Sequence, residues 1–115
     1  CFLMNGQEIA TAAQYGANVI FVVINNGMYG TIRMHQERNY PGRVSGTDLH
    51  NPDFVALAQA YGLHGELVTV TAGFEPAFER CLAMSRPCLI EVRVDPEALT
   101  PRLSLSQIRA QSSKQ

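Results

Sequence analysis

The feature that most constrains the fold of this chain is an apolar run, residues 19–24, that stops at the pair Asn25-Asn26. The run shows no alternation with polar residues, so both of its faces should be covered, as in a central parallel strand flanked by helices. Ligands of such sheets bind at the carboxyl ends of the strands. We therefore expect an α/β fold, a parallel sheet with helices on both faces, with Asn25 and Asn26 at its binding edge.

A helix is expected before this strand, over residues 6–15. Asn5 and Glu8 have the spacing of a capping box, in which each side chain satisfies an otherwise unpaired backbone donor. Gly16 then supplies the left-handed residue with which helices commonly end. Because the capping box explains Glu8 without chemistry, we do not interpret it as a catalytic carboxylate.

The second half of the chain predicts a helix, a strand, a helix and a strand, in that order. Asn51 is expected to cap the first of these helices, with Pro52 in its first turn and Gly62 at its end. Apolar residues at helical spacing mark the inward faces, namely Phe54, Val55, Ala58 and Tyr61, and then Phe74, Ala77, Phe78, Cys81 and Leu82. The remaining elements are strands over residues 66–70 and 88–94 and a helix over residues 74–84.

Two stretches lack such periodicity, residues 36–50 and the C-terminal stretch. Residues 31–35 are expected to begin another helix. Residues 36–50 then predict a long connection, which is usually a functional loop or a lid. The C-terminal stretch is polar, and it predicts one helical turn over residues 105–109 and a disordered end, QSSKQ.

Composition excludes several classes of protein. At 115 residues the chain suits one domain, which we place at residues 1–95, with a tail over residues 96–115. Nine Lys and Arg against ten Asp and Glu give a net charge of −1, which favours neither nucleic acid nor an anionic membrane as a partner. The longest apolar run is far shorter than the roughly 20 residues that cross a bilayer. We expect a cytoplasmic protein.

The cysteines and histidines do not indicate a metal site. Cys1, Cys81 and Cys88 are odd in number and lack a ligand spacing such as C-x-x-C, so buried free thiols are expected. The three histidines are scattered along the chain rather than clustered. Neither pattern supports a zinc centre.

The motif that carries chemistry is Asn25-Asn26-Gly27, and the residues alone leave two interpretations open. Asn-Gly is a common turn dipeptide, so a plain turn explains it. Its place at the end of a buried strand, followed by Gly30 and a helix start, also suits a phosphate group. Amide and carbonyl oxygens suit Mg²⁺, which often bridges to phosphates.

The segment FLMNGQEIATAAQYGANVIFVVINNGMYGTIR resembles the diphosphate-binding segment of thiamine diphosphate-dependent enzymes of the acetolactate synthase and pyruvate oxidase group. The motif of that family begins with Gly-Asp-Gly and ends with Asn-Asn, which is present here as Asn25-Asn26. The Gly-Asp-Gly would fall immediately before Cys1, so we expect a truncated C-terminal cofactor-binding domain of a longer polypeptide. The resemblance continues through NPDFVALAQAYG and RPCLIEVRVDP.

The resemblance implies thiamine diphosphate and Mg²⁺ as cofactors. Asn26 matches the side-chain ligand of Mg²⁺, and Met28 matches the position that gives a backbone carbonyl to the same ion. The positions along the cofactor are Cys1, Gly27, Met28, Tyr29 and Gly30, and those on the substrate side are Thr31, Ile32 and His35. No catalytic residue falls within the chain, because the aspartate ligand precedes Cys1 and the activating glutamate comes from another domain, usually across a subunit interface.

The function implied is that of an acetolactate synthase-like lyase or transferase, which decarboxylates a 2-oxo acid and ligates the product to an acceptor. The implied partners are the 2-oxo acid and the remaining domains of the same polypeptide, in a homodimer or homotetramer. His35 departs from the tryptophan typical of branched-chain acetolactate synthases, and Gly27-Met28-Tyr29 departs from their more acidic or amidic residues. The alternatives are a non-oxidative decarboxylase of 2-oxo acids or of oxalyl-CoA, and a non-catalytic α/β binding module.

Overall fold

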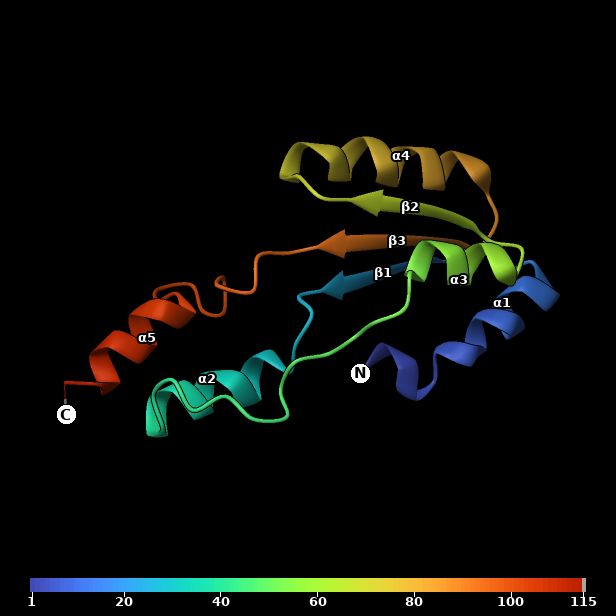
Figure 1. Ribbon diagram of the computed structural model, residues 1–115. Helices are drawn as coiled ribbons and strands as arrows, with labels where there is room; N and C mark the ends of the chain where they lie inside the picture. The colour runs from blue at the N-terminus through green and yellow to red at the C-terminus, as the bar shows by residue number, and fades with distance from the viewer. Residues whose placement is uncertain (115) are drawn as a thin grey trace. The chain divides into compact units, whose positions relative to one another are not determined.

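The computed structural model describes residues 1–114, which divide into two compact units (Figure 1). The first unit comprises Cys1–Asn25 and Pro52–Arg93, and the second comprises Asn26–Asn51 and the segment that begins at Val94. The boundary between them therefore passes through the Asn-Asn pair. None of the described helices is long and apolar enough to cross a membrane.

A three-stranded parallel sheet forms the centre of the first unit, in the order β1-β3-β2. Its strands are β1 (Ile20–Asn25), β2 (His64–Val68) and β3 (Cys88–Arg93). Ile20 and His64 both lie opposite Cys88, so the carboxyl ends of the strands fall at one edge. The expected parallel sheet is confirmed, although β2 begins two residues earlier than expected.

Helices cover both faces of the sheet, as expected. On one face, α1 (Ile9–Tyr15) and α3 (Phe54–Ala60) pack in a core of Ile9, Val23, Phe54, Ala58, Leu63 and Leu89. On the other face, α4 (Phe74–Met84) follows a 3-10 turn, Thr71–Gly73, and packs in a core of Val68, Ala77, Cys81, Cys88 and Ile90. Successive residues of β3 point alternately into the two cores, because side chains alternate between the two faces along a strand.

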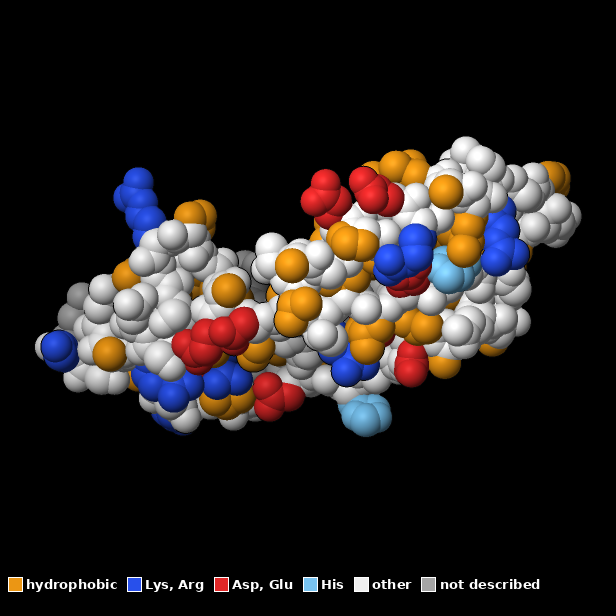
Figure 2. All heavy atoms as spheres, turned by 90° about the horizontal axis from the view of Figure 1, so that it is seen from above, with side chains coloured by type: hydrophobic (Ala, Val, Ile, Leu, Met, Phe, Trp, Pro, Cys, Tyr) orange, Lys and Arg blue, Asp and Glu red, His pale blue; other side chains and the backbone are white. Residues whose placement is uncertain are grey.

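The apolar run at residues 19–24 forms most of β1, which is an edge strand within the described residues and not the central strand expected. Within the described residues β1 pairs with β3 alone, and β3 holds the centre. Val22 and Ile24, on the α4 side of the sheet, are 41% and 62% exposed. Figure 2 looks onto the side that carries α4 in Figure 1 and shows hydrophobic side chains at the surface among charged ones. An unbroken apolar run indicates that a strand is suited to burial, but it does not indicate whether the strand lies at the centre or at the edge of the sheet.

The expected capping box of the first helix is wrong. Asn5 makes no side-chain capping hydrogen bond, and the chain enters α1 through two 3-10 turns, Phe2–Met4 and Gly6–Glu8. Glu8 instead accepts a hydrogen bond from the Thr11 hydroxyl at 2.7 Å. The end of the helix is as expected, since Gly16 has a φ of 58°.

Helix α3 starts at a different N-cap residue from the one expected. The Asp53 carboxylate accepts a hydrogen bond from the Ala56 amide at 2.8 Å, so Asp53 rather than Asn51 is the cap. Both residue types cap helices well, and the sequence offers them two positions apart. Of the expected inward residues in α3 and α4, Phe54, Ala58, Ala77 and Cys81 are buried, whereas Tyr61, Phe74 and Leu82 are at least 36% exposed.

Two of the three cysteines are buried free thiols, as expected. Cys81 in α4 and Cys88 in β3 are buried, and burial is the main reason that the pKa of Cys81 rises to about 12. A protonated thiol is a poor nucleophile, so packing accounts for this pair. Cys1 is exposed, and the expectation of a buried thiol is wrong there.

The second unit is built on two helices, α2 (Gly30–Asn39) and α5 (Leu105–Ser112). Residues 36–39 belong to α2, so the expected loop begins later than predicted. A capping box of Ser104 and Gln107 opens α5, which is longer than the single turn expected. The expected disorder of the last five residues is wrong for the two that lie in α5, and Gln115 lies outside the described residues. The domain boundary at residue 95 stays a prediction.

Candidate cofactor and metal site

The carboxyl end of β1 is fixed to the central strand by a side-chain hydrogen bond. Asn25 Nδ2 donates to Glu91 Oε1 at 2.9 Å. Glu91 is 1% exposed, and Arg93 Nε donates to the same oxygen at 3.1 Å. The sheet therefore holds the first asparagine of the motif.

The turn that follows belongs to the second unit. The Met28 amide donates to Asn26 Oδ1 at 3.2 Å, and Gly27 between them has a φ of 68°, which favours glycine. Met28 pairs with Asp48 in an isolated antiparallel bridge. The two hydrogen bonds of this bridge use the Gly27 carbonyl and the Tyr29 amide, each at 2.8 Å, and neither uses a backbone group of Met28.

Helix α2 begins directly after this turn, and its first residue is crowded. A Cβ on Gly30 would lie 2.9 Å from Asn26 Nδ2 and 3.0 Å from Leu99 Cδ2, so a larger residue here would displace the Asn26 or the Leu99 side chain. Tyr29 at the N-cap makes no side-chain hydrogen bond to the first amides of α2. Such an N-terminus is well suited to a phosphate group.

These groups fit a hard cation bound next to a diphosphate. An amide oxygen has two lone pairs, so Asn26 Oδ1 can accept from the Met28 amide and still bind Mg²⁺. The carbonyl of Met28 offers a second oxygen of the same hard type. Gly27 and Gly30 let a ligand approach the backbone closely.

The residues expected on the substrate side, together with Tyr29 just before them, lie at the start of α2 and are exposed. Tyr29 and Ile32 are 45% and 54% exposed, and Thr31 and His35 are exposed as well. Thr31 and His35 are one turn apart and share a face of the helix. Cys1 belongs to the first unit. Its place along the cofactor stays a prediction, as do the roles of these four residues.

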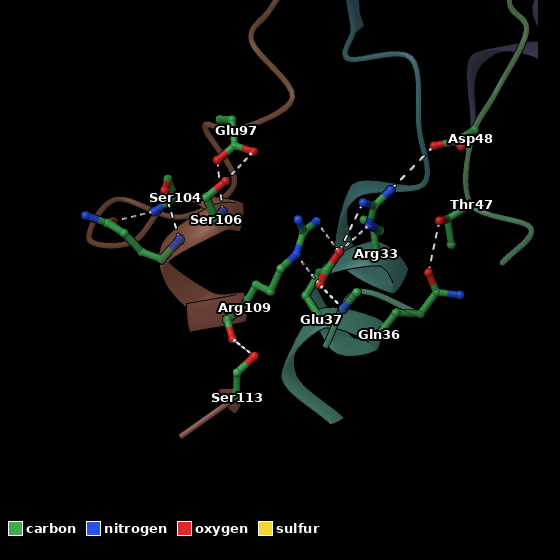
Figure 3. Close-up of polar contacts among 12 residues, drawn as sticks. Arg33, Gln36, Glu37, Thr47, Asp48, Glu97, Ser104, Ser106, Arg109 and Ser113 are labelled. Carbon is green, nitrogen blue, oxygen red and sulfur yellow. Dashed lines mark hydrogen bonds and ion pairs between the residues drawn. The ribbon is translucent and has the colours of Figure 1, made fainter. Parts of the chain in front are cut away.

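Sequence patterns do not single out Glu37, the carboxylate that ties α2 to α5. Glu37 is 1% exposed, and Arg109 of α5 donates to its two oxygens at 2.7 and 2.6 Å (Figure 3). Arg33 Nε donates to Oε1 at 3.0 Å, and the Gly42 amide donates to Oε2 at 2.9 Å. Only the i,i+4 spacing of Arg33 and Glu37 was readable in the sequence, because Arg109 is 72 residues away.

The connection after α2 is tied back to that helix. The Thr47 hydroxyl donates to Gln36 Oε1 at 3.0 Å (Figure 3). Gln36 Nε2 in turn donates to the Ser45 carbonyl at 2.6 Å. Thr47 is 2% exposed. The connection therefore has a defined path in this chain, and its role as a lid stays a prediction.

Glu37 predicts a loss of stability in acid. The hydrogen bond from Arg109 is the main cause that lowers the pKa of Glu37 from 4.5 to about 2. A lowered folded-state pKa adds stability that is present above the unfolded value and is lost as the pH falls from about 5 towards 2. We expect the melting temperature, followed by circular dichroism, to fall across this window, and to fall less in Glu37→Gln.

Exposed Glu79 provides the matched control, and Glu79→Gln should follow the pH curve of the unchanged chain. Part of the acid sensitivity will remain in Glu37→Gln, because Glu66 also has a pKa of about 2. An identical pH dependence in Glu37→Gln and the unchanged chain would contradict this role of Glu37.

A second polar cluster lies between β2 and α4. His64, Glu66 and Cys81 place candidate ligand atoms within 4.8 Å of one another. Glu66 accepts hydrogen bonds from Arg80 on both oxygens and lies 2.9 Å from His64 Nε2, and Arg80 is the main cause of its lowered pKa. The Cys81 thiol is held protonated by burial. Ion pairing and packing thus account for the cluster without a metal.

The fold defines a class of protein, an α/β domain with a parallel sheet whose strand β1 runs directly into an Asn-Gly turn. Residues 1–92 match the family described as "Thiamine pyrophosphate enzyme, C-terminal TPP binding domain". The chain belongs to this family. The expected fold is confirmed by this match and by the similarity to a solved structure.

Relatives of the chain are much longer than the chain itself. The acetolactate synthase of Arthrospira platensis is 36% identical over 95 residues, which are 81% of this chain and 16% of that protein. Acetolactate synthase isozyme 2 large subunit of Escherichia coli (strain K12) is 35% identical over 95 residues, 82% of this chain and 17% of that protein. A solved structure, the thiamine diphosphate-dependent 4-hydroxybenzoylformate decarboxylase of Rhodococcus jostii RHA1, is 36% identical with a TM-score of 0.68, over 79% of this chain and 18% of that one.

Gly30→Ala is expected to impair cofactor binding, with Gly16→Ala as its control. The methyl group at residue 30 meets Asn26 and Leu99, whereas a Cβ at residue 16 meets nothing within 4 Å. We expect Gly16→Ala to cost only stability, about 1 kcal/mol of backbone strain. Titration of both variants of the full-length protein with thiamine diphosphate, together with their thermal unfolding, separates the two effects. Equal affinities in the two variants would contradict the close approach at residue 30.

Proposed function

We propose that this chain is the Mg²⁺- and diphosphate-binding part of a longer thiamine diphosphate-dependent enzyme, which decarboxylates a 2-oxo acid and ligates the product to an acceptor. The observation that carries the proposal is the turn at residues 26–30. It brings together an asparagine oxygen, Gly27 with its positive φ, Gly30 packed against the Asn26 side chain, and a helix N-terminus. The family match covers these residues. The acetolactate synthases among the relatives support the ligation step.

In this proposal each residue of the turn has a defined task. The Asn26 side chain and the Met28 carbonyl hold Mg²⁺, and Gly27 and Gly30 bring backbone amides to the diphosphate. Tyr29 and Cys1 contribute backbone contacts, and the exposed residues Thr31, Ile32 and His35 line the substrate side. The cofactor supplies the electron sink for decarboxylation, and the protein supplies its binding and orientation.

The remaining groups come from outside this chain. We propose that an aspartate ligand of Mg²⁺ precedes Cys1 in the same polypeptide, and that a glutamate from another domain activates the cofactor across a subunit interface. The enzyme would then be a cytoplasmic homodimer or homotetramer. The low coverage of the relatives, 16% and 17% of their length, leaves room for such domains.

A simple decarboxylase is the second candidate, because the solved relative is a decarboxylase of an aromatic 2-oxo acid by its name. The test is to supply the full-length protein, with thiamine diphosphate and Mg²⁺, with pyruvate or with 4-hydroxybenzoylformate. Carbon dioxide release with acetolactate formation supports ligation, and release with an aldehyde product supports the decarboxylase. Absence of both turnover and cofactor binding would support a non-catalytic binding module and contradict the proposal.

A further inference from the structure

The charged residue Glu91 lies in the most buried strand of the sheet. It is 1% exposed, and its neighbours Leu89 and Ile90 in β3 are fully buried apolar residues. Its Oε1 accepts from Asn25 and Arg93, at 2.9 and 3.1 Å. Its Oε2 is buried and has no hydrogen-bond partner within the described residues.

Stability alone does not explain a carboxylate at this position. Burial of a charge is costly, and a buried oxygen without a donor adds to the cost. Replacement of a buried ion pair by apolar residues of similar size is often neutral or stabilising. Arg93, the charged partner, is 54% exposed in its side chain and can be solvated by water without Glu91.

The hydrogen bond to Asn25 suggests what Glu91 does. Asn25 is the last residue of β1 and directly precedes Asn26, the proposed ligand of Mg²⁺, in the chain. A side-chain amide held by a buried carboxylate in the central strand fixes the end of β1, from which the turn departs. Outer groups that orient a metal ligand in this way are often needed for tight binding.

We propose that Glu91 is a positioning residue for the Mg²⁺-diphosphate turn, and that it acts through the Asn25 side chain. This inference rests on the proposed function. According to this inference, the buried carboxylate of Glu91 contributes to cofactor affinity rather than to the stability of the sheet.

The test uses Glu91→Leu in the full-length protein, with Glu66→Leu as the matched control. Glu66 is also a poorly exposed carboxylate in this sheet, but it faces α4, and its partners are His64 and Arg80. For each variant, isothermal titration gives the affinity for thiamine diphosphate at saturating Mg²⁺, and thermal unfolding of the cofactor-free protein gives the stability. Affinity and stability are thus measured separately.

We expect Glu91→Leu to weaken cofactor binding by about tenfold or more, the range typical of outer groups, without a matching loss of melting temperature. Glu66→Leu should leave the affinity unchanged. Glu91→Gln should retain an affinity within about threefold, because its amide oxygen can still accept from Asn25. In an Asn25→Leu background, Glu91→Leu should add no further loss, because the two residues act as one unit.

Unchanged affinity in Glu91→Leu, or an equal loss in Glu66→Leu, would overturn the inference. If Glu91→Leu does not fold, Asn25→Leu removes the same hydrogen bond from the other side, and an unchanged affinity there would overturn it equally. Failure of the unchanged full-length protein to bind the cofactor is a different result, because it contradicts the proposed function itself.

Discussion

Asn26→Ala in the full-length protein should abolish retention of Mg²⁺ and thiamine diphosphate, whereas Asn25→Ala should only weaken it. The physical reason is that the Asn26 side chain is the proposed direct ligand, while Asn25 donates its side-chain hydrogen bond to Glu91. Losing a ligand of a hard cation should exceed the roughly 10–100-fold loss that follows removal of an outer group. The measurement is the cofactor content of each variant after gel filtration.

The pair of asparagines supplies its own control, because the two substitutions are chemically identical and adjacent. Asn26→Ala also removes the hydrogen bond that closes the turn, so the melting temperature of the cofactor-free protein must be compared as well. Equal cofactor content in the two variants would contradict the assignment of Asn26 as the metal ligand.

The 115-residue chain by itself should have no catalytic activity and should bind thiamine diphosphate poorly. It contains one of the two side-chain ligands proposed for Mg²⁺ and no domain that would hold the aminopyrimidine ring. We expect its affinity to lie at least about 1,000-fold below that of the full-length protein, which corresponds to roughly 4 kcal/mol. The exposed apolar face of β1 at Val22 and Ile24 should also favour self-association.

Titration calorimetry on the chain and on the full-length protein measures this difference, and sedimentation velocity measures the self-association. Val22→Thr/Ile24→Thr keeps β-branched residues in the strand and should reduce self-association without changing cofactor affinity. Cofactor affinity in the chain equal to that of the full-length protein would mean that the missing groups have been assigned to the wrong place.

Local sequence patterns predicted most of the helices and strands. They did not predict features that depend on tertiary contacts, such as the position of a strand in the sheet. The apolar run at residues 19–24 predicted a strand, but its place in the sheet depends on partners that its own sequence does not encode. Helix α4 has the predicted bounds, because its apolar periodicity is strong. Asn5 fails as a cap because the 3-10 turns set a backbone that its side chain cannot use.

In the candidate site, too, some features were predictable from local sequence and others depend on distant partners. Gly27 was predictable as a turn residue, because its φ of 68° favours glycine, whereas the contact of Gly30 with the Asn26 side chain is not visible in the sequence. The buried carboxylates Glu37 and Glu91 were not, because each depends on a partner more than 60 residues away in the sequence, 72 for Arg109 and 66 for Asn25. Spacing rules within one helix or strand do not report such pairs.

The most direct test of the account is a titration of the cofactor-free full-length protein with thiamine diphosphate, with Mg²⁺ present and with Mg²⁺ removed by a chelator. The account predicts saturable binding that requires Mg²⁺, since the Asn26 side chain and the Met28 carbonyl would hold that ion in the proposed site. Binding of equal affinity with and without Mg²⁺, or no binding under either condition, would contradict it.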